Sequence, residues 1–236
     1  MDIYSAKTAL VTGSTRGVGR IIADHFLKHG AEVIGFARGP SSLESQAYHH
    51  VQVDLADPLA IQQAFLGLHK RIARIDIVVN NAAVLTSQYA MIMPPAAAQA
   101  MVNVNLVAPF IVSREAAKFM RKSKWGRIIN IGSMAVALEP IGDSVYAATK
   151  AGLSTLANVM AKEFGAMNVT CNTLGITAIE SDMLAQLPRD KIEAIIAGLP
   201  VPRFAKAEDI LNVVDFFASD ASGYITAQTV FLGGVN

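Results

Sequence analysis

The chain has 236 residues, a formal net charge of +1 and only 17% charged residues. This length fits one large α/β domain or two small ones, and it suffices to bury a core without disulfides. Because there is no basic stripe or acidic tail, neither nucleic acid nor an anionic membrane is expected as a partner. The hydrophobic content of 52% is typical of strands that are buried on both faces.

The cysteine and histidine content gives no sign of a disulfide framework or a metal site. The single cysteine, Cys171, lies in an apolar stretch and is expected to be a buried, inert thiol. His49 and His50 have no Cys or further His at ligand spacing, so we expect a solvated loop there and no metal. No basic segment leads into an apolar one near residue 1, and no uninterrupted apolar stretch approaches the roughly 20 residues of a membrane span. A cytoplasmic location is therefore expected.

Short β-branched runs alternate with longer Ala- and Leu-rich segments along the chain. The runs that predict strands are residues 8–11, 32–37, 50–53, 75–79, 127–131, 169–173 and 229–232. Helical patterns occupy residues 17–29, 58–72, 97–122, 145–164, 191–197 and 207–217, whereas residues 39–49 are too short and broken for a crossover helix. This alternation implies right-handed crossovers and a parallel sheet. We expect one α/β domain over residues 1–236: a Rossmann-type, doubly wound parallel sheet of about seven strands flanked by helices on both faces.

The first predicted strand ends in a glycine-rich turn, and a helix begins at once. Glycines at positions 13, 17 and 19 let the backbone turn sharply and approach a pyrophosphate, whose charge the helix N-terminus would favour. The spacing differs from G-x-G-x-x-G, and such a turn alone is equally compatible with a tight connection. The preceding strand and the following helix favour a dinucleotide.

Ser133, Tyr146 and Lys150 are the residues best suited to chemistry. Residues four apart on a helix lie on the same face, so the Tyr146 phenol and the Lys150 ammonium would point into one small volume. A nearby positive charge lowers the pKa of a phenol, which would make Tyr146 a general acid or base. Ser133 follows an apolar run that reads as a buried strand. A Tyr and a Lys at this spacing are, by themselves, more often the rim of an amphipathic helix.

Several short motifs occur in one characteristic order along the chain. They are the glycine turn, Asp54-Leu55, Asn80-Asn81-Ala82, Asn103-Val104-Asn105, Ser133 and the Tyr146/Lys150 pair. In this order and spacing the chain resembles the short-chain dehydrogenase/reductase family over essentially its whole length. Within that family it is similar to members of the 3-oxoacyl-carrier-protein reductase and dihydrodiol dehydrogenase types.

The resemblance implies hydride transfer between a nicotinamide and a carbonyl or carbinol carbon, with four catalytic residues. Tyr146 would donate the proton, Ser133 would bind the substrate oxygen, and Lys150 would lower the pKa of Tyr146 and hold the nicotinamide ribose. Asn105 would hold a water that relays protons to Lys150. The cofactor-binding residues expected from the turn and the resemblance are Gly13, Ser14, Thr15, Arg16, Gly17, Val18, Gly19, Arg38, Asp54, Leu55, Asn81, Ala82, Tyr146, Lys150 and Ile179.

The end of the second predicted strand indicates which dinucleotide is bound. Ala37 stands where NAD users of the family carry an Asp that binds the ribose hydroxyls. Arg38 follows it, and Arg16 lies within the glycine turn. Two guanidinium groups suit a 2′-phosphate, although either arginine could instead be a solvated surface charge. The sequence therefore predicts NADP(H).

Two departures from the family pattern concern the substrate end. Ile176-Thr177 replaces the usual Pro-Gly, so we expect the following loop to take a different path. Ala83 replaces a glycine and would narrow the space beside the cofactor. A substrate lid is expected at about residues 180–203, where the apolar content suits a small or acyl-chain substrate and equally suits ordinary helix core.

Three functions remain open. The first is an NADPH-dependent reductase of a ketone, with a 3-oxoacyl thioester as one option and an acyl carrier protein as a candidate partner. The second is an NAD(P)-dependent alcohol, sugar or dihydrodiol dehydrogenase. The third is a catalytically weak NADP(H)-binding regulatory or structural subunit. Small residues along the helices 97–122 and 145–164, which build oligomers in this family, lead us to expect a homodimer or homotetramer.

Overall fold

A seven-stranded parallel sheet forms the centre of the molecule, in a computed structural model that describes residues 3–179 and 189–235. Its strands are β1 (Thr8–Thr12), β2 (Glu32–Ala37), β3 (Tyr48–Gln52), β4 (Ile77–Asn80), β5 (Gly126–Ser133), β6 (Val169–Ile176) and β7 (Thr229–Phe231). They are arranged in the order β3-β2-β1-β4-β5-β6-β7, which confirms the expected doubly wound fold. From β1 the chain adds strands towards one edge of the sheet, and from β4 it adds them towards the other edge. In such sheets ligands bind at the carboxyl ends of the strands beside this switch point.

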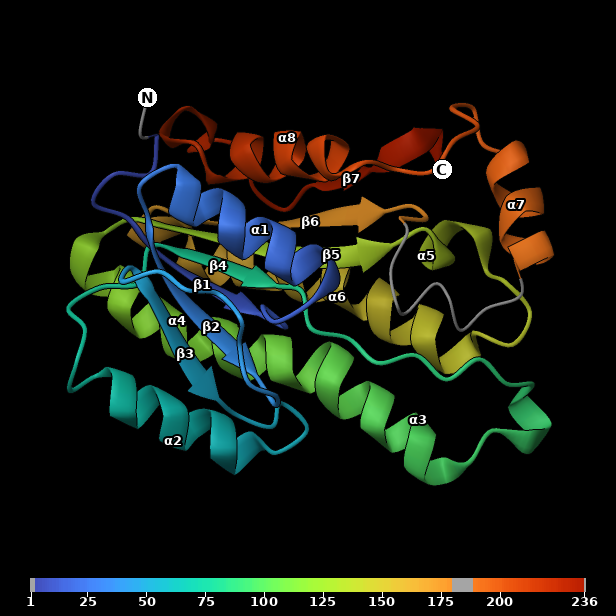
Figure 1. The fold of residues 1–236 in the computed structure, drawn as a ribbon, viewed down its shortest axis with the longest axis horizontal. Coiled ribbons are helices and arrows are strands. Elements are labelled where there is room, and N and C mark those ends of the chain that lie inside the picture. Colours follow the sequence, from blue (N-terminus) through green and yellow to red (C-terminus); the bar gives the residue numbers. More distant parts are fainter. Residues whose placement is uncertain (1–2, 180–188, 236) are drawn as a thin grey trace.

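Helices cover both faces of the sheet (Figure 1). The helices α1 (Gly17–Lys28) and α8 (Ala207–Ala218) pack on one face, and α2 (Pro58–Leu68), α4 (Ala108–Ser123) and α6 (Ser144–Phe164) lie on the other. Shorter segments complete the described chain: η1 (Ala90–Ile92), α3 (Pro95–Val102), the π-helix η2 (Asn103–Val107), α5 (Ala135–Leu138), η3 (Gly165–Met167), α7 (Arg189–Ala197), η5 (Asp220–Ser222) and η6 (Leu232–Gly234).

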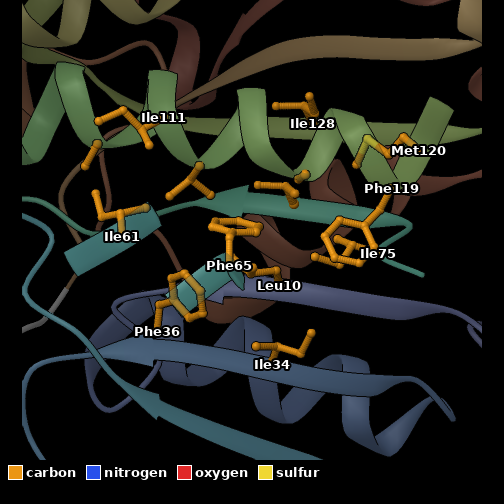
Figure 2. Close-up of a cluster of buried hydrophobic side chains, with 14 of the residues drawn as sticks. Leu10, Ile34, Phe36, Ile61, Phe65, Ile75, Ile111, Phe119, Met120 and Ile128 are labelled. Carbon is orange, nitrogen blue, oxygen red and sulfur yellow. The ribbon is translucent and has the colours of Figure 1, made fainter. Parts of the chain in front are cut away.

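The core consists of two layers, one on each side of the sheet. Figure 2 shows the layer between the sheet and the helices α2 and α4, where Phe36 and Phe65 meet edge to face at 5.5 Å between ring centroids. The other layer joins β1 and β2 to α1 and α8, with Phe26 and Phe217 fully buried. These two layers account for the nearly continuous apolar strands, because each strand is covered on both faces.

Several boundaries differ from those predicted. The helix expected at 97–122 is three segments, because a wide π-turn at Asn103–Val107 separates α3 from α4. β3 begins at Tyr48, two residues before the predicted start, so the expectation that His49 and His50 lie in a solvated loop was wrong. These histidines pair with Ile34 and Gly35 of β2. Residues 39–47 contain no helix, as expected, and α5 was not predicted. Of the expected lid, residues 180–188 lie outside the described part.

The segment Pro95–Ser123 has the length and apolar composition of a membrane-spanning helix. In this fold its α4 part packs against α2, β4, β5 and α6. Val112, Ala116 and Met120 of that part are completely buried. The apolar composition is thus used in the core of the domain, and a core helix passes the same test of length and composition.

Candidate active site

The glycine turn after β1 is closed by contacts with the neighbouring strands. Gly13 has φ +70°, in the left-handed region that favours glycine, and its N–H donates to the carbonyl of Phe36 at 2.7 Å. A Cβ at Gly19 would lie 2.2 Å from the carbonyl oxygen of Gly13. The absence of side chains at these positions therefore lets the first turn of α1 pack directly on the bend.

Thr12 joins the turn to the end of β4. Its Oγ1 accepts hydrogen bonds from the N–H groups of Asn81 at 2.9 Å and Ala82 at 3.0 Å. The Asn81 side-chain amide donates in turn to the Thr12 carbonyl at 3.0 Å. The Asn-Asn-Ala motif thus fixes the carboxyl ends of β1 and β4 side by side, at the point where the strand order reverses.

A cavity of about 570 Å³ extends from the glycine turn to the start of α6. The residues predicted from sequence that line it are Gly13, Thr15, Arg16, Gly17, Val18, Arg38, Asp54, Leu55, Asn81, Ala82, Tyr146, Lys150 and Ile179. Ala37, Ala83 and Ile176, which the sequence analysis discussed without assigning them to binding, also line it. Seven further lining residues were not expected at the site: Gly39, Val53, Val84, Leu85, Val104, Ile131 and Gly132. Several of these residues directly follow or precede a predicted site residue at the end of a strand. Their position at a strand end is the sequence feature that could have identified them.

Four predicted residues are not part of the cavity lining. Ser14 is fully buried beneath the turn, and Gly19 is buried where α1 meets Gly13. Ser133 stands at the end of β5, where its Oγ accepts a hydrogen bond from the N–H of Ala135 at 3.1 Å. Asn105 is fully buried in η2. Their roles in binding and catalysis stay predictions.

Tyr146 and Lys150 come from the first two turns of α6 and are both nearly inaccessible, at 8% and 2% exposure. The Lys150 Nζ lies 5.9 Å from the centroid of the Tyr146 ring. It donates a hydrogen bond of 2.7 Å to the carbonyl of Ile131, two residues before Ser133 on β5. The strand β5 and the helix α6 therefore bring the three residues singled out in the sequence to one end of the cavity.

Burial determines the ionisation of this pair. It raises the pKa of Tyr146, with hydrogen bonding to Ser133 acting in the opposite direction and the Asp143 carboxylate adding to the rise. Burial also lowers the pKa of Lys150 to about 8. The expectation that Lys150 would give Tyr146 a lowered pKa is not met in this structure, because desolvation of the phenolate outweighs the stabilising influences. Tyr146 is accordingly protonated at neutral pH, which is the form that a proton donor needs.

Asn105 uses its side-chain amide within the protein. Its Oδ1 accepts from the N–H of Val84 at 2.9 Å, and its Nδ2 donates to the Val84 carbonyl at 2.9 Å and to Thr149 Oγ1 at 3.2 Å. Thr149 itself donates to the carbonyl of Tyr146 at 2.7 Å. Asn105 therefore holds the cavity-lining residue Val84 against the helix that carries Tyr146 and Lys150.

The Ile176-Thr177 departure lies at the end of β6. Ile176 continues the strand in register with Ser133, and its carbonyl accepts from the N–H of Met134 at 2.8 Å. Ile176 also lines the cavity, whereas Thr177 is buried against Gly233. Ile179 also lines the cavity, and its contact with the nicotinamide carboxamide stays a prediction. Ile176 and Ile179 thus add apolar surface to the cavity that Tyr146 also lines.

Arg16 and Arg38 stand at the opposite end of the cavity. Both are exposed, and Ala37 beside Arg38 is buried in the wall. Within residues 3–179 and 189–235, neither arginine forms an ion pair. Over the same residues, no group of three or more His, Cys, Asp or Glu side chains could hold a metal ion.

Comparison with known proteins identifies the class. The family model described as short chain dehydrogenase matches residues 7–192, so the chain belongs to this family of oxidoreductases, whose members use a nicotinamide cofactor. It is similar to the 3-oxoacyl-(acyl-carrier-protein) reductase FabG of Escherichia coli K12, with 32% identity over 98% of this chain and 97% of the relative. The corresponding Pseudomonas aeruginosa reductase is 34% identical over 97% and 96% of the two chains.

Solved structures give the same class. A short chain dehydrogenase/reductase family protein superposes with a TM-score of 0.87 and 31% identity, covering 98% of this chain and 97% of the other. A provisionally assigned gluconate dehydrogenase from Agrobacterium tumefaciens superposes with a TM-score of 0.89 and 27% identity, covering 99% and 96%. The fold is therefore that of the short-chain dehydrogenase/reductase family.

Proposed function

We propose that the protein is an NADPH-dependent oxidoreductase that reduces a ketone to a secondary alcohol. The observation that carries the proposal is that one cavity joins the glycine turn to the buried Tyr146/Lys150 pair. The turn suits a dinucleotide, because Gly13 and Gly17 line the cavity without side chains and α1 begins at Gly17, so its N-terminus is available to a pyrophosphate. When bound, the nicotinamide supplies the hydride.

The residues at the buried end divide the remaining chemistry. Tyr146 donates its phenolic proton to the oxygen on which negative charge develops, and Ser133 donates a hydrogen bond to the same oxygen. Lys150 contributes a positive charge beside Tyr146 and binds the nicotinamide ribose. Because the amide of Asn105 is engaged by Val84 and Thr149, a relay water at Asn105 would use its backbone carbonyl.

The preference for NADP(H) is supported by side chains at the other end. Arg16 and Arg38 are exposed at the cavity rim, where guanidinium groups can bind a phosphate in a bidentate manner. Ala37 presents no carboxylate that would repel the 2′-phosphate. Asp54 and Leu55 would border the adenine, Asn81 its ribose, and Ile179 the nicotinamide carboxamide.

A 3-oxoacyl thioester is the substrate that the curated relatives support, since those relatives are named as 3-oxoacyl-(acyl-carrier-protein) reductases. An acyl carrier protein is then a candidate partner. We also propose a homodimer or homotetramer and a cytoplasmic location. The second candidate is an alcohol, sugar or diol dehydrogenase, which the structural likeness to a provisional gluconate dehydrogenase favours.

A turnover panel tests these alternatives. Loss of NADPH absorbance is followed with ketones and 3-oxoacyl thioesters, and NADP reduction is followed with alcohols, sugars and diols. Faster reduction of a thioester than of any simple ketone supports the leading proposal, whereas turnover of sugars alone supports the second. Tight NADPH binding without turnover in either direction would mean a non-catalytic NADP(H)-binding subunit.

A further inference from the structure

A tyrosine from the edge of the sheet reaches the glycine turn from behind. The Tyr48 hydroxyl and the Ser14 hydroxyl share a hydrogen bond of 2.9 Å, although the residues are 34 positions apart. Tyr48 is 9% exposed and Ser14 is fully buried, so water does not compete for this bond. Ser14 lies between Gly13 and Thr15, both of which line the cavity.

Gly35 on β2 leaves the space through which the tyrosine passes. A Cβ at Gly35 would lie 2.0 Å from the Tyr48 hydroxyl and 2.4 Å from Ser14 Oγ. The glycine therefore permits the side chain of β3 to cross β2 and reach the turn after β1. Three strands contribute to this single contact.

The ring of Tyr48 is held on its other sides. It packs in the core layer beneath α1 and lies nearly parallel to the His50 ring, with 6.2 Å between centroids. The His50 Nδ1 lies 3.4 Å from the Tyr48 hydroxyl. Because residues 39–47 form no helix, Tyr48 also enters the sheet directly after a short connection. The hydroxyl is thus fixed in position before any ligand binds.

We propose that Tyr48 is a positioning residue for the dinucleotide, which acts through Ser14 to hold the glycine turn in its binding conformation. The inference rests on the proposed function, because it assumes that this turn holds the pyrophosphate. A turn that is already ordered loses less conformational freedom on binding, and this increases affinity. The hydroxyl of Tyr48 touches neither cofactor nor substrate, so its effect falls on binding and leaves the chemical step unchanged.

The test is a fluorescence titration of NADPH against the full-length protein and its variants Tyr48→Phe, Ser14→Ala and the double variant. Each single variant is expected to raise the Kd for NADPH about three- to tenfold, as expected for loss of one buried neutral hydrogen bond. The double variant should bind NADPH no more weakly than the weaker-binding single variant, since the two substitutions remove the same hydrogen bond. The kcat of Tyr48→Phe at saturating NADPH should stay within about twofold of wild type, because Tyr48 does not line the cavity.

The matched control is Tyr224→Phe, which removes a hydroxyl from a fully exposed tyrosine. An unchanged Kd in Tyr48→Phe, additive effects in the double variant, or a lowered melting temperature without a change in Kd would each overturn the inference. If the wild type binds neither NADPH nor NADH, the proposed function fails together with it. If the wild type binds and the variants bind equally well, only the role of Tyr48 fails.

Discussion

The Nζ of Lys150 donates a hydrogen bond of 2.7 Å to the carbonyl of Ile131, so the lysine of the Tyr146/Lys150 pair is tied to the strand that carries Ser133. This bond compensates in part for the burial of an ammonium group that is only 2% exposed. Ile131 and Lys150 both line the cavity. The position of the charge is thus set by the sheet as well as by the helix.

The pKa of Lys150 predicts an upper pH limit for activity. Burial lowers this pKa to about 8, so the ammonium is present below that pH and is lost as the pH rises through it. We expect kcat/KM for NADPH, which reports the free enzyme, to be constant below about pH 8 and to fall above it. Initial rates from pH 6 to 10 measure this. A profile that stays level to pH 10 would contradict the assigned role of the charge.

The two arginines at the rim predict how cofactor preference can be changed. Arg38→Ala and Arg16→Ala should each raise the KM for NADPH about tenfold or more, because a charge-assisted hydrogen bond to the phosphate is lost, and should affect NADH much less. Removal of the exposed Arg71, away from the cavity, serves as the control. Equal losses with both cofactors would assign the arginines a general electrostatic effect instead of recognition of a 2′-phosphate.

Alanine substitution at Gly19 and at Gly67, both of which lie in helices, is predicted to change the unfolding free energy in opposite directions. In Gly19→Ala the added Cβ would lie 2.2 Å from the Gly13 carbonyl oxygen, so we expect unfolding free energy to fall by about 1–3 kcal/mol and NADPH binding to weaken. In Gly67→Ala the Cβ meets nothing within 4 Å, and stability should rise by about 0.5–1 kcal/mol. Urea unfolding of both variants measures this, and equal stabilities would refute the packing argument.

The hydrogen bonds of Asp215, on the face of the sheet opposite α4, predict that the unfolding free energy decreases at acid pH. Burial raises its pKa, but hydrogen bonds from His25 and Tyr4 outweigh burial and hold the pKa below its usual value of 3.8. A depressed pKa in the folded state adds stability above that usual value, and this stability is lost as the pH falls below about 4. Asp215→Asn should therefore lower unfolding free energy at pH 7, by about 1–3 kcal/mol, and by less at pH 3. A difference that is the same at both pH values would refute this.

The parts of the site that follow strand ends could be predicted from sequence. The apolar run before Ser133 and the glycines after β1 are local patterns, and the spacing of Tyr146 and Lys150 follows from helix geometry. All three were found where the sequence placed them, around one cavity or at its end. The seven lining residues that were not expected are mostly sequence neighbours of predicted site residues such as Arg38, Asp54 and Asn105, and their side-chain directions depend on strand pairing.

Other features depend on contacts between distant parts of the chain. The Tyr48–Ser14 hydrogen bond joins residues 34 positions apart, and no local sequence pattern around either residue predicts it. The π-turn at Asn103–Val107 interrupts a continuous apolar periodicity, and its residue Asn105 both accepts a hydrogen bond from the Val84 N–H and donates one to the Val84 carbonyl. The raised pKa of Tyr146 was missed for a related cause, because burial of the phenol is a property of the folded state alone.

The central claim is that Tyr146 donates the proton in carbonyl reduction. Its most direct test is the single-turnover rate of NADPH oxidation with saturating ketone or thioester, in wild type and Tyr146→Phe. Removal of the hydroxyl should lower this rate by about 10²- to 10⁴-fold, while the Kd for NADPH stays within about twofold of wild type. A Tyr146→Phe protein that oxidises NADPH at the wild-type rate would contradict the account.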